Sequence, residues 1–242
     1  MASVFIADLH LSLTGRREDS KAFGRFLEEL TSQKEVDRLF ILGDLFTYWY
    51  EHPKVDIYGS HPAFRALRNF RSRGKKVYFL RGNRDFMAGP FFKKHSKVNF
   101  IGDSYIINTP QKRIYLTHGD MLAKKDIRYR MWSAFIRFPL ASFIFKRLPV
   151  ESAIALVDRF KEVGKKAPAS EEVIAEMITE EARRQFKKES DVIITGHAHY
   201  RVSKCFTINK KEKFLYILPE FSYPGEFLFL NDRGELTYRC LS

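Results

Sequence analysis

Side chains that can bind a metal ion follow five short apolar runs in this chain. The five runs end in Asp8-Leu9-His10, Gly43-Asp44, Gly82-Asn83-Arg84-Asp85, His118-Gly119-Asp120 and Gly196-His197-Ala198-His199. Apolar runs that stop at such residues are typical of buried parallel strands. Ligands of open α/β sheets bind just beyond the carboxyl ends of the strands. We therefore expect these polar groups to meet at one edge of a sheet.

The chemistry of the set favours divalent metal ions. The seven candidate ligands are Asp8, His10, Asp44, Asn83, His118, His197 and His199. They combine imidazole nitrogens with carboxylate and amide oxygens, and the lack of thiolates disfavours iron–sulfur clusters and structural zinc. Seven ligands are too many for one tetrahedral zinc ion, so the set suits two ions in higher coordination. Asp44 is the natural bridge between them, because a carboxylate has two oxygens.

Each motif alone also has an ordinary structural explanation. Asp8 could cap a turn beside a surface histidine, and a Gly-Asn turn is common for steric reasons. In the same motif, Arg84 has a functional interpretation as well, since its fork of donors could clamp a phosphate. Asp120 and Asp126 could anchor His118 and nearby arginines, or could be simple turn and cap residues. The metal hypothesis therefore depends on the five motifs occurring together.

Length and composition predict one domain, or one domain with an insertion. The chain has 242 residues and is 45% hydrophobic, which suffices for a sizeable core. It contains no long uncharged apolar run, so no transmembrane helix is expected, and its start lacks the basic segment of a signal peptide. Two cysteines, Cys205 and Cys240, make no disulfide framework, so a reducing cytosol is the default expectation.

The formal net charge of +13 predicts an anionic partner. Nucleic acid, a phosphorylated metabolite and an anionic membrane surface all fit, and charge alone cannot choose among them. A solvated basic surface without a partner is the plainer alternative.

The pattern of apolar residues predicts strands and helices in alternation, typical of an α/β fold. Helices are expected over 19–32, 62–73 and 170–188. Strands are expected over 3–7, 37–44, 76–80, 191–195, 213–218, 225–230 and 235–240, with two or three short ones between 98 and 116. Three aromatic residues at 48–50 could stack on a base or sugar, or could close over the sheet edge.

From residue 126 to about 166 the pattern becomes helical, and phenylalanine and arginine alternate. Pro139 and Pro149 break this segment into short helices. It is too short and too charged to span a bilayer. It suits a helical insertion that lies over the site or against a membrane surface, although a plain helical hairpin packed on the sheet is the alternative.

The ordered set of five motifs resembles the calcineurin-like metallophosphoesterase superfamily over residues 3 to about 199. The resemblance implies a four-layer α/β/β/α sandwich and two metal ions that activate water for attack on phosphorus. It implies that Asp8, His10, Asp44 and His199 bind one ion. It also implies that Asp44, Asn83, His118 and His197 bind the other, while Asn83 and Arg84 touch the phosphate.

Within the superfamily the chain is similar to the UDP-2,3-diacylglucosamine pyrophosphohydrolases of lipid A synthesis. The similarity rests on Gly82-Asn83-Arg84-Asp85-Phe86, on Gly43-Asp44-Leu45-Phe46 with Trp49, on His118 with Asp126 and Tyr129, and on Leu148-Pro149. It implies cleavage at the α-phosphorus to UMP and 2,3-diacylglucosamine 1-phosphate, with manganese as metal. It also implies a single domain over 1–242 with a helical cap at about 124–167.

The same resemblance implies further residue roles and a location. Catalytic residues would be Asn83, Arg84 and His118, and substrate contacts would be Arg84, Phe86, Asp126, Tyr129, Phe135, Lys165 and Lys166. The enzyme would be cytoplasmic and peripheral on the anionic inner membrane, with an acylated UDP-sugar as substrate and nucleic acid an unlikely partner.

The chain departs from this family at several positions. Thr47 replaces an acidic residue, Ala153 replaces a basic one, and Ala198 and Tyr200 alter the last motif. Three alternatives therefore stay open: a metallophosphoesterase of soluble nucleotides or other phosphodiesters, a nuclease, and a non-catalytic scaffold. Retention of all seven ligands argues against the scaffold.

Overall fold

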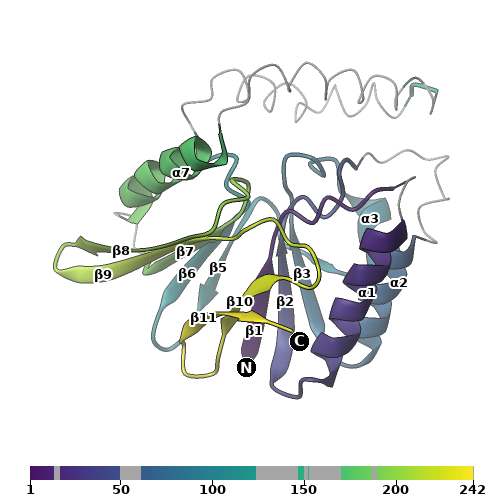
Figure 1. Cartoon of the computed structure of the whole chain (residues 1–242), viewed down its shortest axis with the longest axis horizontal. Helices are drawn as coiled ribbons and strands as arrows, with labels where there is room; N and C mark the ends of the chain where they lie inside the picture. Colours follow the sequence, from purple (N-terminus) through teal and green to yellow (C-terminus); the bar gives the residue numbers. More distant parts are fainter. Residues whose placement is uncertain are drawn as a thin grey trace.

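Two mixed β-sheets pack face to face, and helices cover their outer faces (Figure 1). The computed structural model describes residues 1–13, 17–49, 61–123, 147–149, 152, 170–186 and 190–241. The first sheet has the order β11 (Leu236–Cys240), β10 (Glu226–Leu230), β1 (Ala2–Ile6), β2 (Val36–Leu42), β3 (Lys76–Leu80), β4 (Asn99–Phe100). The second has the order β5 (Ser104–Asn108), β6 (Arg113–Thr117), β7 (Val192–Thr195), β9 (Lys211–Ile217), β8 (Val202–Ile208).

Residues on opposite faces of the strands build separate hydrophobic cores. On β1, Val4 and Ile6 belong to a cluster with α1 (Arg17–Ser32), α2 (Pro62–Ser72) and α3 (Pro90–Ser96), whereas Phe5 packs between the two sheets. On β7, Ile194 faces the space between the sheets and Ile193 faces α7 (Glu171–Gln185). Side chains alternate between the faces of a strand, so three cores separate four layers. The expected α/β/β/α sandwich is confirmed for the described residues.

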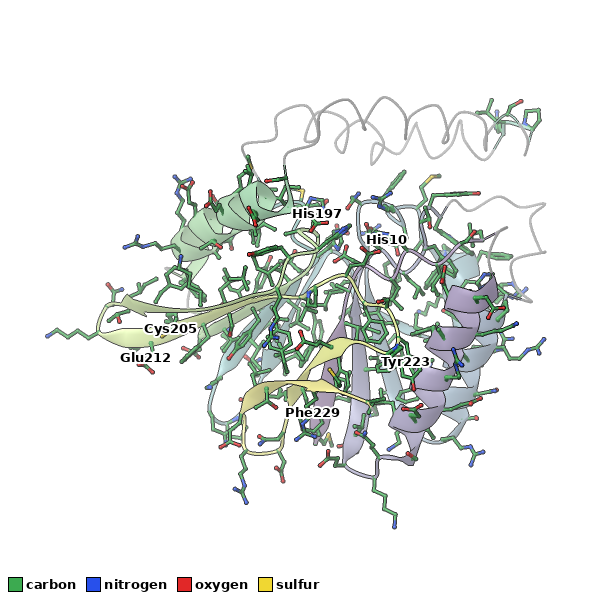
Figure 2. All side chains as sticks on the ribbon, in the orientation of Figure 1. His10, His197, Cys205, Glu212, Tyr223 and Phe229 are labelled. Atoms are coloured by element: carbon green, nitrogen blue, oxygen red, sulfur yellow. The ribbon has the colours of Figure 1, made fainter. Side chains whose placement is uncertain are left out.

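Parallel pairing brings the strand ends to one edge of the molecule. β1, β2, β3 and β4 are parallel neighbours in the first sheet, as are β6, β7 and β9 in the second. Figure 2 shows His10 and His197, from the ends of β1 and β7, close together at this edge. Cys205 lies on β8, away from it, and both cysteines are free and exposed.

Most of the expected elements are present, but two were missed. The helix α3 has only seven residues, too few for a periodic pattern to be recognised, and begins with Pro90 after Gly89. In β8 the half-buried Val202, Phe206 and Ile208 alternate, but exposed Lys204 interrupts the pattern. The helix expected over 170–188 is observed as Glu171–Gln185.

Two further expectations concern segments near the site. Trp49 is 1% exposed and packs among Phe46, Phe64 and Phe92, so it closes the core and presents no face to a ligand. Most of the expected cap at 124–167 lies outside the described residues. No helix in the described ranges is both long and apolar enough to cross a membrane.

Candidate metal centre

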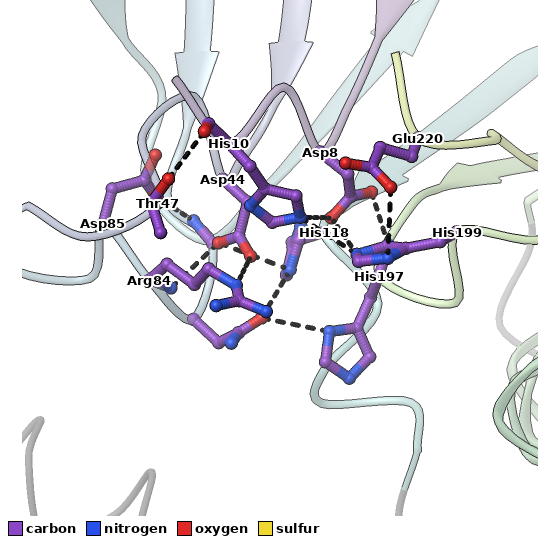
Figure 3. A network of polar contacts seen from close by, with 12 residues as sticks. Asp8, His10, Asp44, Thr47, Arg84, Asp85, His118, His197, His199 and Glu220 are labelled. Atoms are coloured by element: carbon purple, nitrogen blue, oxygen red, sulfur yellow. Dashed lines mark hydrogen bonds and ion pairs between the residues drawn. The ribbon is translucent and has the colours of Figure 1, made fainter. Parts of the chain in front are cut away.

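Three of the candidate ligands form a first cluster at the ends of β1 and β7. The Nε2 atoms of His10 and His199 lie 3.1 Å apart. The Oδ1 atom of Asp8 lies 3.4 Å from His199 Nε2 and 4.0 Å from His10 Nε2. All three ligand atoms thus point to one small volume, as Figure 3 shows.

The other candidate ligands form a second cluster beside it. Asn83 Oδ1 lies 2.9 Å from His118 Nε2 and 3.0 Å from His197 Nδ1. His118 Nε2 also lies 3.7 Å from Asp44 Oδ1, and Asp8, Asp44 and His118 form a buried group of ligand atoms. The structure therefore brings all seven sequence-predicted ligands together at one edge of the two sheets.

The hydrogen bonding of this second cluster indicates that a cation belongs there. His118 Nδ1 lies 2.8 Å from the carbonyl oxygen of Leu42, which can only accept, so Nδ1 must donate. In a neutral ring the lone pair of Nε2 then faces Asn83 Oδ1, which is also an acceptor. Two acceptors at this distance repel each other unless a cation, either a proton or a metal ion, lies with them.

The first cluster also contains a polar atom that needs a partner. Asp8 Oδ1 is buried and has no hydrogen-bond partner among the described residues. A buried carboxylate oxygen without a hydrogen bond is costly. Oxygen and imidazole nitrogen without thiolate suit a divalent ion, so the residues present fit the metal pair that the sequence predicts.

The pKa values show that negative charge is crowded at this site. Burial raises the pKa of Asp44, and Asp85 and Asp8 add to the effect despite the opposing charge of His118. Burial alone would lower the pKa of His118, but Asp44, Asp8 and Asp120 raise it to about 9. Buried carboxylates this close are stabilised by added positive charge, which is what divalent ions supply.

Two histidines are instead held neutral, as a metal ligand requires. Burial lowers the pKa of His10 to about 3, despite the opposing charge of Asp8. Burial and the charge of His118 lower the pKa of His197 to about 4. Both rings therefore offer a free lone pair at neutral pH.

Backbone strain is concentrated at the same residues. Eight non-glycine residues of the described chain have positive φ, and five of them are candidate ligands: Asp8, His10, Asp44, His197 and His199. Such conformations are uncommon for residues other than glycine, and they cluster at functional sites. Strain at five of seven predicted ligands supports the assignment of a site independently of the side-chain distances.

The glycines of the motifs allow the loops to approach one another. A Cβ atom on Gly82 would lie 2.1 Å from Asp44 Oδ1, and one on Gly196 would lie 2.4 Å from Asp8 Oδ2. Only glycine leaves room for a carboxylate this close to the backbone. The sequence pattern Gly-Asp, Gly-Asn and Gly-His is thus explained by packing between neighbouring loops.

Two of the predicted substrate contacts lie at this site or next to it in the chain. Arg84 Nε lies 3.4 Å from Asp44 Oδ2, and its side chain is 38% exposed, so the guanidinium borders the metal centre and remains reachable from solvent. Phe86 is half-buried two residues further on. The other predicted contacts, Asp126, Tyr129, Phe135, Lys165 and Lys166, lie outside the described residues.

Four polar residues at the site received no firm role from the sequence. Asp85 is fully buried and bonds to the backbone of two ligand loops. Thr47 Oγ1 donates to the carbonyl oxygen of His10 at 2.6 Å. Asp120 is buried, and its charge acts to raise the pKa values of His118 and His197. Glu220 Oε2 lies 3.9 Å from the Nδ1 atom of His199.

Comparison with known proteins identifies the class. The family model of calcineurin-like phosphoesterases matches residues 1–201, and the chain belongs to this family. Its members are metal-dependent hydrolases, so the predicted enzyme class is confirmed, and the Asp and His groups described above are where divalent ions can bind.

Curated relatives extend the comparison across almost the whole chain. Two proteins named UDP-2,3-diacylglucosamine hydrolase are each 32% identical to this chain. The match to the Psychromonas ingrahamii protein covers 82% of this chain and 81% of that protein. The match to the Stenotrophomonas maltophilia protein covers 82% of each chain. The Aeromonas salmonicida protein of this name is 28% identical over 94% of this chain and 89% of its own length. The predicted family resemblance is thereby confirmed.

Proposed function

We propose that this chain is a dinuclear metal hydrolase that cleaves the pyrophosphate of UDP-2,3-diacylglucosamine to UMP and 2,3-diacylglucosamine 1-phosphate in lipid A synthesis. The observation that carries the proposal is the convergence of seven N and O ligands in a chain whose relatives bear that name. A pair of bound divalent ions, which we expect to be manganese, would lower the pKa of water and neutralise charge on phosphate oxygens.

The chain's own residues would orient the substrate around this centre. Arg84 presents a guanidinium beside Asp44 and can bind two phosphate oxygens at once. The amide NH2 of Asn83 is available to a further phosphate oxygen, because its Oδ1 atom faces the two histidines. The bond from His118 Nδ1 to the Leu42 carbonyl fixes the orientation of that ring. Asn83, Arg84 and His118 are therefore the residues proposed to act on the phosphate.

The test of this function is hydrolysis by the purified protein with Mn²⁺ in water enriched in ¹⁸O. UDP-2,3-diacylglucosamine is compared with UDP-glucosamine, which lacks the acyl chains. We expect UMP from the acylated compound alone, and we expect the ¹⁸O label in UMP, since attack at the α-phosphorus leaves the new oxygen there. Equal turnover of both compounds would favour a soluble nucleotide substrate, and label in the sugar phosphate would contradict attack at the α-phosphorus.

We also propose that the protein docks on an anionic membrane surface through α2 and α3. Residues 62–102 contain eleven lysines and arginines and a single acidic residue, the buried Asp85. Lys75 donates to two backbone carbonyls, and seven other cations of this stretch form no ion pair with a carboxylate of the described chain: Arg65, Arg71, Arg73, Lys76, Lys93, Lys94 and Lys97. Unpaired cations on neighbouring elements attract an anionic lipid surface.

Vesicle sedimentation tests this docking face. We compare Lys93→Glu/Lys94→Glu on α3 with Lys210→Glu/Lys211→Glu at the β8–β9 turn, which changes the net charge equally; all four lysines are exposed. At about 1 kcal/mol for each lysine near the surface, the α3 variant should bind phosphatidylglycerol vesicles at least about 30-fold more weakly. Equal weakening in both variants would show that net charge alone attracts the protein.

A further inference from the structure

Asp85 is a buried carboxylate that joins two of the loops carrying candidate ligands. Its side chain is 0% exposed. Its Oδ1 atom accepts a hydrogen bond from the backbone N–H of Gly82 at 2.7 Å, and its Oδ2 atom accepts one from Leu45 at 2.8 Å. Each oxygen therefore holds a different segment, one after β3 and the other after β2.

The same two loops are also joined in the opposite direction. Asp44 Oδ1 accepts a hydrogen bond from the backbone N–H of Arg84 at 2.8 Å. The loop after β2 thus contributes a carboxylate to the loop after β3, and Asp85 returns one (Figure 3). Charged acceptors of backbone N–H groups form strong hydrogen bonds, so this reciprocal pair sets the spacing of the two loops.

That spacing determines the geometry of the second cluster. Asp44 belongs to one loop and Asn83 to the other, and His118 Nε2 lies 3.7 Å and 2.9 Å from their Oδ1 atoms. No side chain separates the loops, because Gly82 packs directly against the Asp44 carboxylate. If the loops moved apart, Asp44 and Asn83 would no longer reach a common point beside His118.

We propose that Asp85 is a positioning residue of the metal centre: its carboxylate holds the loops after β2 and β3 at the spacing that lets Asp44 and Asn83 bind the same metal pair. It is not itself a ligand, since both of its oxygens are occupied by backbone N–H groups. The inference rests on the proposed function, because it needs that metal pair, but it concerns a residue outside the seven predicted ligands.

The test is a calorimetric titration of the EDTA-treated protein with Mn²⁺. Asp85→Asn keeps the size of the side chain but replaces one acceptor oxygen with an NH2 donor, which then faces a backbone N–H. Loss of a group that orients metal ligands typically costs 10–100-fold in metal affinity, so we expect the Kd for Mn²⁺ to rise about 10–100-fold. Affinity is measured without substrate, so the result does not depend on turnover.

Asp191→Asn is the matched control. Asp191 Oδ2 also accepts a backbone N–H, that of Arg113 at 2.8 Å, but it precedes β7, at the end of that strand opposite to His197. We expect this control to keep the parental Kd. Parental affinity in Asp85→Asn would overturn the inference and leave the proposed function standing, whereas failure of the unmodified protein to bind Mn²⁺ would overturn both.

Amide hydrogen exchange in the unmodified, metal-free protein gives a second readout if Asp85→Asn does not fold. We expect the amides of Leu45 and Gly82 to exchange as slowly as those inside β2, because Asp85 holds them in the absence of metal. Exchange at the rate of exposed loops would show that Asp85 does not hold the two loops.

Discussion

Substituting Gly196 by alanine would press a methyl group against the buried Asp8. The added Cβ would lie 2.4 Å from Asp8 Oδ2 and 2.6 Å from the Cβ atom of Ala7. Contacts this short do not occur between packed atoms, so either the aspartate or the loop that carries His197 must move. Gly196 does not have a positive φ, so the effect is purely steric.

Two costs set the size of the effect. Overpacking a well-packed interior costs about 1–3 kcal/mol. Asp8 Oδ2 also accepts the backbone N–H of His197 at 2.8 Å, and losing a hydrogen bond to a charged group costs about 1.5–3 kcal/mol. We expect the free energy of unfolding of Gly196→Ala to fall by about 2.5–6 kcal/mol, the sum of these two costs, and its Mn²⁺ affinity to fall because Asp8 is displaced.

Urea unfolding in EDTA measures the structural part of this prediction. Gly24→Ala is the matched control, because within the described part of the chain the added Cβ meets only the Cβ of Ala66, at 4.0 Å, and Gly24 lies in the interior of α1. Alanine is more favourable than glycine in a helix by about 0.5–1 kcal/mol, so the control should be stabilised. An unfolding free energy unchanged in Gly196→Ala would refute the argument that close approach of the loops requires glycine there.

Three further predictions follow from single contacts. Thr47→Val removes the hydroxyl that donates to the His10 carbonyl; we expect weaker Mn²⁺ binding by calorimetry, and unchanged affinity would assign Thr47 to folding alone. Arg84→Ala should lower kcat/KM by about 100-fold, while the Mn²⁺ affinity stays nearly unchanged because Arg84 is not a ligand. An equal loss of kcat/KM and of Mn²⁺ affinity would contradict the proposed role of Arg84 on the phosphate. Burial raises the pKa of Asp191, but hydrogen bonds from Lys213 and a backbone N–H outweigh it and lower the pKa. This contribution to stability is present above the unfolded-chain pKa of about 3.9 and is lost as the pH falls through the folded value. The unfolding free energies of parent and Asp191→Asn should therefore converge below about pH 4, and a constant gap would exclude this ionisation as the cause.

The ligand loops could be predicted from the sequence because their signal is local. Each is an apolar strand that stops at a ligand residue, and parallel pairing brings such ends together without further information. The role of Asp85 could not be found in this way. Its bond to Leu45 joins residues 40 positions apart, and no pattern around either residue indicates the contact.

The helix α3 and the strand β8 could not be predicted for the opposite reason. They have no clear local signal, because their stability comes from tertiary contacts. The helix α3 is held by Phe92, which packs against Phe46, Phe64 and Phe79. β8 is fixed by antiparallel pairing with β9 over its whole length. Intrinsic preference is only a weak guide to segments this short, because packing against neighbours overrides it.

The stoichiometry of Mn²⁺ binding tests the central claim most directly. Calorimetric titration of the EDTA-treated protein should give two ions per chain. His10→Ala should retain one of them, because among the described residues the Nε2 atom of His10 is grouped with the ligand atoms of Asp8 and His199 in the first cluster. One ion or none in the unmodified protein, or two retained in His10→Ala, would contradict a dinuclear centre built from the seven residues at the strand ends.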